Sequence, residues 1–152
     1  MKKVFLSTPF AGKVDPATGE VTADFRRAIE GVLDALRKTT DVEVFSVLED
    51  DNWRIVDVPA EVDVKFDLEQ LDAADVLLVL TAETVSPTAQ FEMGYAVAKN
   101  KQVILASLVG AKTGYFNQGV ASNGMMTLVT YDNLSTLIKQ LDVALHAPEE
   151  NV

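Results

Sequence analysis

The chain has 152 residues, 48% of them hydrophobic and 24% charged, and its formal net charge is −10. This size and composition suit one folded domain with its own core, and the negative charge argues against nucleic acid or an anionic membrane surface as a partner. The sequence contains no cysteine and one histidine, which excludes disulfides, thiolate metal sites, cysteine nucleophiles and multi-histidine metal centres.

Apolar periodicity divides the chain into alternating strands and helices. No stretch reaches the length of a membrane span or of a signal-peptide core, so we expect a cytoplasmic protein. In chain order, we predict a strand over 3–8, a loop over 10–21, a helix over 22–38, a strand over 42–47, an acidic loop over 49–59, a helix over 60–74, a strand over 75–81, a helix over 87–100, a strand over 102–108, a polar loop over 110–124, a strand over 126–131 and a final helix capped by Asp132.

This alternation predicts an α/β fold, in which a doubly wound, mostly parallel five-stranded sheet carries helices on both faces. We expect one domain over 1–146 and a flexible acidic tail over 147–152. Ligands of such sheets bind beyond the carboxyl ends of the strands, at the point where the strand order reverses. Three segments are therefore of interest: the loop after the first strand, the loop that holds Trp53, and the segment from Thr81 to Glu92.

Glu92 is the strongest candidate for chemistry. It is the only charged residue between Thr84 and Ala98, and its neighbours are almost all apolar. A carboxylate in apolar surroundings is costly unless it meets water, a donor or a ligand. A solvated glutamate on a helix surface is the simpler alternative, which this neighbourhood disfavours.

Asp67 is the second candidate, because it shares a helical stripe with the apolar residues Leu71 and Ala74. An exposed aspartate paired with Lys65 or Arg54 explains the same spacing equally well. Two carboxylates on either side of one sugar are what cleavage of a glycosidic bond needs, since one attacks the anomeric carbon and the other assists the leaving group.

Ser86 fits a helix N-cap, and the same hydroxyl at a helix N-terminus suits a phosphate or another polar substituent. Gly94 permits a close approach of backbone to a strand or to a ligand. Trp53, the only tryptophan, is expected either to stack on a base or to pack over the sheet edge. The sequence has neither a G-x-G-x-x-G nor a Walker motif, and we expect no metal and no cofactor.

Three segments resemble the nucleoside 2-deoxyribosyltransferase family. The run from Val4 to Phe10 is similar to its first strand and loop, so we expect Phe5, Ser7 and Phe10 to contact substrate. Phe66–Val76 is similar to the helix that leads into its buried strand. Phe91-Glu92-Met93-Gly94-Tyr95-Ala96 is similar to its E-[LM]-G-Y-A motif, which is the most specific of the three.

The resemblance implies a flavodoxin-like fold and a double displacement. Glu92 would attack C1′ of a (deoxy)nucleoside, form a glycosyl ester and pass the 2-deoxyribosyl group to another base, while Asp67 would contact the substrate. It also implies a homo-oligomer in which a neighbouring subunit completes the site. The expected donor segment is Ser122-Asn123-Gly124-Met125, with Asn123 and Met125 as substrate contacts.

Two positions depart from the transferases. Phe5 replaces a tyrosine that orients the nucleophile, and Ser86 replaces an aspartate six residues before it. Both residues resemble the nucleoside 5′-monophosphate N-glycosidase branch, in which the serine contacts the phosphate and water is the acceptor. Lys13, Arg26 and Arg54 are candidates for the positive charge that a phosphate needs.

Alternatives from other classes remain open at this point. One is a non-catalytic module that binds nucleotides on the same fold, and the absent tyrosine gives it some support. A weaker one is a flavodoxin-like electron carrier, although no loop specifically calls for a flavin. The preferred base, the sugar, and the choice between transferase and hydrolase are not decided by the sequence.

Overall fold

The structure is a computed structural model that describes residues 1–10, 12–39 and 41–148. The last four residues of the expected acidic tail, 149–152, lie outside the described residues. The elements follow the order β1 (Lys2–Ser7), α1 (Ala23–Thr39), β2 (Val42–Ser46), α2 (Val47–Asp50), α3 (Ala60–Ala73), β3 (Val76–Thr81), α4 (Pro87–Ala98), β4 (Gln102–Leu108), α5 (Tyr115–Ser122), β5 (Thr127–Tyr131) and α6 (Leu134–Leu145).

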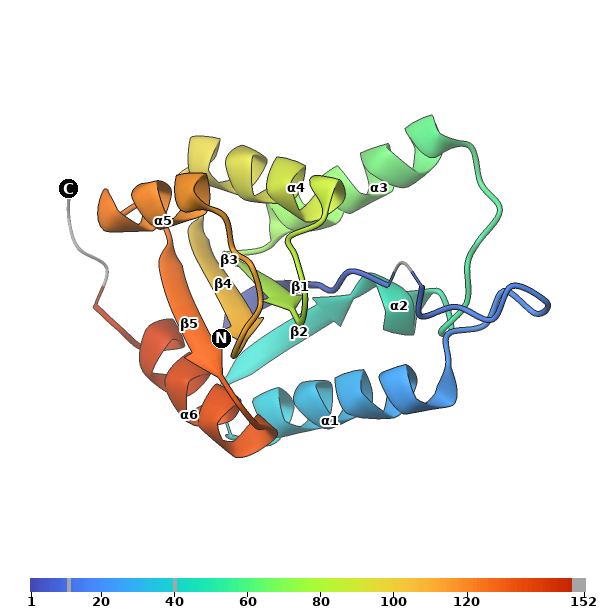
Figure 1. Ribbon diagram of the computed structural model, residues 1–152. Coiled ribbons are helices and arrows are strands. Elements are labelled where there is room, and N and C mark those ends of the chain that lie inside the picture. Colours follow the sequence, from blue (N-terminus) through green and yellow to red (C-terminus); the bar gives the residue numbers. More distant parts are fainter. Residues whose placement is uncertain (11, 40, 149–152) are drawn as a thin grey trace.

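The sheet is the centre of the molecule. Its five strands pair in the order β2-β1-β3-β4-β5, and every pairing is parallel. Helices α3, α4 and α5 lie on one face, while α1 and α6 lie on the other (Figure 1). The predicted α/β class, five strands and two covered faces are therefore confirmed, and the order is the flavodoxin-like one, with its switch point between β1 and β3. None of the described helices is both long and apolar enough to cross a membrane.

Alternation along β1 sends its side chains to two separate cores. Val4 and Leu6 pack in the cluster beneath α1 and α6, whereas Phe5 packs in the cluster that also contains Met93 of α4. Ser7 follows Phe5 by two positions and so faces the same side as Phe5, at the carboxyl end of the strand. Every residue of β3 is buried, as expected for a parallel strand covered on both faces.

Three local predictions were wrong. The polar loop predicted over 110–124 contains α5, which two hydrogen bonds between Gln90 and Asn117 tie to α4. The acidic loop predicted from residue 49 overlaps α2. The cap of α6 is Asn133 rather than Asp132, because Asn133 accepts from the Thr136 amide and Thr136 accepts from the Asn133 amide in a capping box.

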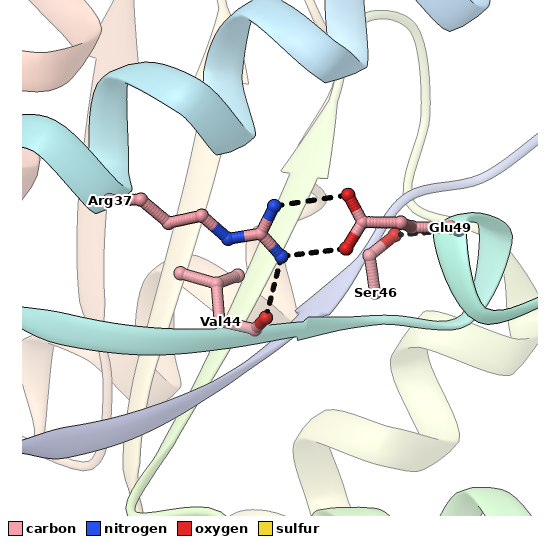
Figure 2. Close-up of polar contacts among 4 residues, drawn as sticks. All are labelled: Arg37, Val44, Ser46 and Glu49. Atoms are coloured by element: carbon pink, nitrogen blue, oxygen red, sulfur yellow. Dashed lines mark hydrogen bonds and ion pairs between the residues drawn. The ribbon is translucent and has the colours of Figure 1, made fainter.

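Helix α2 is a single turn that two anchors hold in place. The Ser46 hydroxyl accepts a hydrogen bond from the Glu49 amide at 3.4 Å. Arg37 of α1 donates to both carboxylate oxygens of Glu49, at 3.0 and 2.7 Å, and to the Val44 carbonyl at 3.0 Å (Figure 2). This bidentate contact lowers the pKa of Glu49. It fixes the turn that forms one wall of the cavity described next.

Candidate active site

A cavity of about 320 Å³ opens at the carboxyl end of β1, where the reversal of strand order predicts a ligand. Its walls come from β1 and the following loop, from α2 and the following loop, and from the first turns of α3 and α4. Of the residues that the sequence singled out, the cavity brings together seven: Phe5, Ser7, Phe10, Arg54, Asp67, Ser86 and Glu92.

Glu92 lies on the second turn of α4 and is only 7% exposed. The solvated-surface alternative is therefore wrong. The Ser7 hydroxyl donates a hydrogen bond to its Oε1 at 3.1 Å. The pKa of Glu92 is raised to about 7, mainly by burial and also by the charge of Asp67, while the Ser7 hydrogen bond acts to lower it. Its carboxylate thus stands at the cavity wall, held by one donor from the sheet.

Asp67 is half-buried on α3 and lines the same cavity. Its Oδ1 is the one buried side-chain oxygen or nitrogen among the described residues that has no hydrogen-bond partner. The proposed pairing with Lys65 or Arg54 is absent, because Arg54 pairs with Glu20 at 3.1 Å and Lys65 lies 3.9 Å from Glu69.

Burial raises the pKa of Asp67 to about 6, and the nearby Asp63 and Asp51 add to that increase. An unpaired buried carboxyl oxygen is costly to keep without a partner. A ligand in the cavity would supply that partner.

Ser86 occupies the N-cap of α4 and accepts a hydrogen bond from the Ala89 amide at 3.1 Å. Pro87 follows at the first helical position, which suits its fixed backbone angle. The preceding turn is tied by the Thr81 hydroxyl, which donates to the Thr84 carbonyl at 3.0 Å. The Ser86 oxygen accepts from the helix, so its proton is free to be donated into the cavity at the positive end of α4.

Phe5 stands where the resemblance implies a tyrosine. Its ring is buried, with its centroid 5.6 Å from that of Phe45, and it forms part of the cavity floor. Ser7, one pleat further along the strand, supplies the hydroxyl that contacts Glu92. Phe10 is 38% exposed and stands at the rim.

Trp53 does not line the cavity, so its predicted stacking on a base is wrong. It is 6% exposed and packs in the core cluster on the α1 face with Val21 and Leu48. The guanidinium carbon of Arg26 lies 5.3 Å from its ring centroid. A large aromatic ring gains more by full burial than by standing at a solvent-facing edge.

Gly94 also lies away from the cavity. It is exposed on α4, and a Cβ added there would have no atom within 4 Å apart from those of its own helix backbone and chain neighbours. It follows Glu92 by two residues, which is more than half a helical turn, so the two residues face opposite sides of α4. The expected close approach to a ligand is absent from this chain.

Asn123 and Met125 lie at the opposite edge of the sheet from the cavity. Asn123 caps the end of α5 and donates to the Gly119 carbonyl at 2.9 Å. Met125 is 53% exposed beside the amino ends of the strands. Neither lines the cavity of its own chain, and their contribution from a neighbouring subunit remains a prediction.

Sequence reasoning missed two carboxylates of the cavity, Asp51 and Asp63. Asp63 carried a usable signal, because it precedes Asp67 by four residues and so lies on the same helical face. Asp51 carried none, since it ends a single-turn helix that was expected to be a loop. Of the proposed cations, Arg54 lines the cavity, whereas Lys13 and Arg26 do not.

Chemically, the site offers two neighbouring carboxyl groups that both resist ionisation. Each has a pKa raised into the neutral range, so between about pH 6 and 7 the two groups together hold one proton. Such a pair can provide an anion for attack and an acid for proton transfer. No three histidine, cysteine, aspartate or glutamate side chains of the described residues are grouped so that they could hold a metal ion.

No protein-family model matches the sequence, and no curated protein matches it significantly. Solved structures do match. The CMP N-glycosidase BcmB of Clostridium botulinum has a TM-score of 0.67 and 20% identity, over 93% of this chain and 98% of its own. BlsM, determined in solution, has a TM-score of 0.75 and 21% identity, over 99% and 98%. A conserved protein of Enterococcus faecalis V583 has a TM-score of 0.62 and 16% identity, over 93% and 97%. At these identities, the matches establish the fold.

Proposed function

We propose that the chain belongs to the nucleoside 2-deoxyribosyltransferase and nucleotide N-glycosidase group and cleaves the N-glycosidic bond of a nucleoside or nucleotide. One observation carries the proposal: the buried carboxylate of Glu92, held by Ser7, shares a cavity with Asp67, whose buried oxygen has no partner. The motif around Glu92 and the fold that the chain shares with a CMP N-glycosidase support the same activity.

In the first step, a carboxylate oxygen of Glu92 attacks C1′ while the bond from C1′ to the base nitrogen breaks. The electron pair of that bond stays on the nitrogen, and neutral Asp67 donates a proton to the departing base. The productive state therefore has Glu92 ionised and Asp67 protonated, which is the less populated of the two singly protonated forms, because the pKa of Glu92, about 7, exceeds that of Asp67, about 6. The Ser7 hydrogen bond favours that state, because it lowers the pKa of Glu92.

In the second step, water attacks C1′ and the ester bond to Glu92 breaks. The carboxylate of Asp67 accepts the proton of the water, which returns both groups to their starting states. A second base can replace water as the nucleophile, and its ring N–H proton then passes to Asp67. Hydrolysis and transfer thus use the same two carboxyl groups.

For the substrate, Ser86 favours a nucleoside 5′-monophosphate. Its hydroxyl lines the cavity at the N-terminus of the 12-residue helix α4, where backbone amides and the helix dipole favour an anion. Arg54 is the one basic side chain of the cavity, although it pairs with Glu20. We therefore propose hydrolysis of monophosphates ahead of transfer between nucleosides.

The test compares the wild type with Glu92→Ala and with Glu83→Gln, a control at an exposed glutamate outside the cavity. Each is incubated with nucleosides and with 5′-monophosphates, with and without a free acceptor base, and base release and exchange are followed. We expect release from monophosphates by the wild type and the control and none by Glu92→Ala. Unimpaired release by a folded Glu92→Ala protein contradicts the mechanism. Binding without turnover across the panel favours the non-catalytic nucleotide-binding module.

The expected homo-oligomer also belongs to this proposal. Large aromatic side chains stand exposed on two helices that hydrogen bonds tie together: Phe91 of α4 is 59% exposed, and Tyr115 and Phe116 of α5 are 87% and 68% exposed. We expect light scattering to show more than one copy of the chain and Phe116→Ser to weaken that assembly. A monodisperse wild-type monomer contradicts this part of the proposal.

A further inference from the structure

Acidic side chains are concentrated on one side of the cavity. Four carboxylates line it, and three of them, Asp51, Asp63 and Asp67, come from α3 and the end of α2. They are close enough for Asp51 and Asp63 both to raise the pKa of Asp67. The one basic side chain of the cavity, Arg54, pairs with Glu20 at 3.1 Å and is more than half exposed. The acidic wall of the cavity, formed by Asp51, Asp63 and Asp67, therefore offers more hydrogen-bond acceptors than donors.

The layout of the elements assigns this wall to the base. Glu92 and Ser86 both belong to α4, which contacts β3 and β4. Helix α3 contacts β1, and the centroid of its Phe66 ring lies 6.1 Å from that of Phe45 of β2. The cavity is lined from α4, β1 and α3, so it runs across β1 from α4 towards α3. A sugar with C1′ at Glu92 and its 5′ end at Ser86 then points its base away from α4.

From this placement, which rests on the proposed function, we propose that Asp51 and Asp63 are specificity residues that select bases with an exocyclic amino group over the corresponding oxo bases. The class of substrate is thus a nucleoside or nucleotide of cytosine or adenine rather than of uracil or hypoxanthine. Neither aspartate takes part in bond cleavage.

The reason is the match of donors and acceptors. An ionised aspartate only accepts hydrogen bonds, and an exocyclic amino group donates them. An oxo group at the same position would bring a second acceptor against the carboxylates and leave half-buried Asp51 without the donor that an amino group supplies, whereas exposed Asp63 keeps access to water. Unpaired polar groups of this kind account for the strongest discrimination that binding sites achieve. Apolar neighbours on the same side of the cavity, Val47 and Ile55, suit the faces of a planar ring.

The experiment measures kcat/KM for cytosine and uracil compounds that share one sugar and one phosphate state, since the two bases differ in shape by little more than the amino and oxo groups. The wild type is expected to prefer cytosine by at least about tenfold. Asp63→Asn and Asp51→Asn should each reduce that ratio by at least about fivefold, because the amide can donate to the oxo group. Asp57→Asn, at an exposed aspartate outside the cavity, should leave the ratio unchanged.

The outcomes separate this inference from the proposed function. If the wild type releases both bases with a cytosine-to-uracil ratio of kcat/KM near one, selection by Asp51 and Asp63 is overturned. The same holds if both variants keep the wild-type ratio. Either result leaves the proposed cleavage intact. Absence of base release from every compound overturns the proposed cleavage instead. In that case, calorimetric titration with free cytosine and free uracil still tests whether Asp51 and Asp63 select the amino base. Equal binding of the two bases overturns the inference. Circular dichroism and a thermal melt verify that each variant is folded.

Discussion

The hydroxyl of Ser7 donates a hydrogen bond of 3.1 Å to Oε1 of Glu92, across 85 positions of the chain. One residue ends the strand β1 and the other lies on the second turn of α4. The contact exists because parallel β1 and β3 are neighbours and α4 follows β3 directly. It is the one hydrogen bond recorded for the Glu92 side chain within the described residues, so it orients the proposed nucleophile.

Replacing Ser7 by alanine should weaken catalysis in a pH-dependent way. Loss of the hydrogen bond removes the contact that lowers the pKa of Glu92, so that pKa should rise. A hydrogen bond to a charged group is worth about 1.5 kcal/mol or more, so kcat/KM should fall about tenfold. The loss should shrink at higher pH, where Glu92 ionises without help. Ser7→Thr should restore activity, Ser135→Ala on exposed α6 is the control, and an unchanged pH profile in Ser7→Ala argues against this role.

The pH dependence of kcat/KM should be bell-shaped. Cleavage needs one ionised and one protonated carboxyl group, and the pKa values of Asp67 and Glu92 are about 6 and about 7. Below this range both groups are protonated and Glu92 cannot attack, and above it both are ionised and Asp67 cannot donate. The maximum should therefore lie between the two values. Asp67→Asn should remove the basic limb and leave a single acidic limb that reports the pKa of Glu92 alone, which should be lower than about 7 because the like charge of Asp67 is gone. A flat profile across this range contradicts the shared proton.

Burial of Glu92 should cost stability at alkaline pH. Folding raises the pKa of Glu92 from 4.5 to about 7, so the folded state favours the protonated carboxyl group. The resulting contribution to the free energy of unfolding is fully present below about pH 4.5 and is lost as the pH rises through about 7. Glu92→Gln keeps the shape and the contact with Ser7 without the charge. It should stabilise the protein by on the order of 1–3 kcal/mol at about pH 8 and change little at about pH 4.5. Urea unfolding at both pH values measures this, with Glu83→Gln as the control. A Glu92→Gln protein less stable than the wild type at the higher pH refutes the argument.

Substitution of Ser86 should separate monophosphates from nucleosides. Aspartate and asparagine both cap helices as well as serine does, so Ser86→Asp and Ser86→Asn should retain the melting temperature. Ser86→Asp places a negative charge where the phosphate is proposed to lie. It should raise the KM for a 5′-monophosphate by at least about tenfold and leave that for a nucleoside nearly unchanged. Steady-state kinetics on both substrates measures the difference, with Ser86→Asn as the uncharged control. Equal effects on both substrates place the phosphate elsewhere.

Apolar periodicity was enough to predict the architecture. The positions of the five strands, the burial of β3 on both faces and the covering helices α1, α3, α4 and α6 follow from local patterns, because each pattern reflects which side chains must leave water. Helix α5 does not, since its segment was expected to be a loop. The same reasoning identified Glu92, since a single carboxylate in an apolar helix needs a particular reason to be there. Capping was less well predicted: adjacent residues such as Asp132 and Asn133 are both good caps, and only the backbone geometry chooses between them.

What the tertiary structure decided is which of these side chains meet. Ser7 and Glu92 become partners only when β1 and β3 pair. The carboxylate cluster forms only when α2, which contacts β2, and α3, which contacts β1, meet at the cavity. From its place in the sequence, Trp53 was expected either to stack on a base or to pack over the sheet edge. In the structure its ring is buried in the core cluster on the α1 face of the sheet. Such contacts join distant segments, so their energies have no signature in a local window of sequence. They depend on the packing of the whole chain.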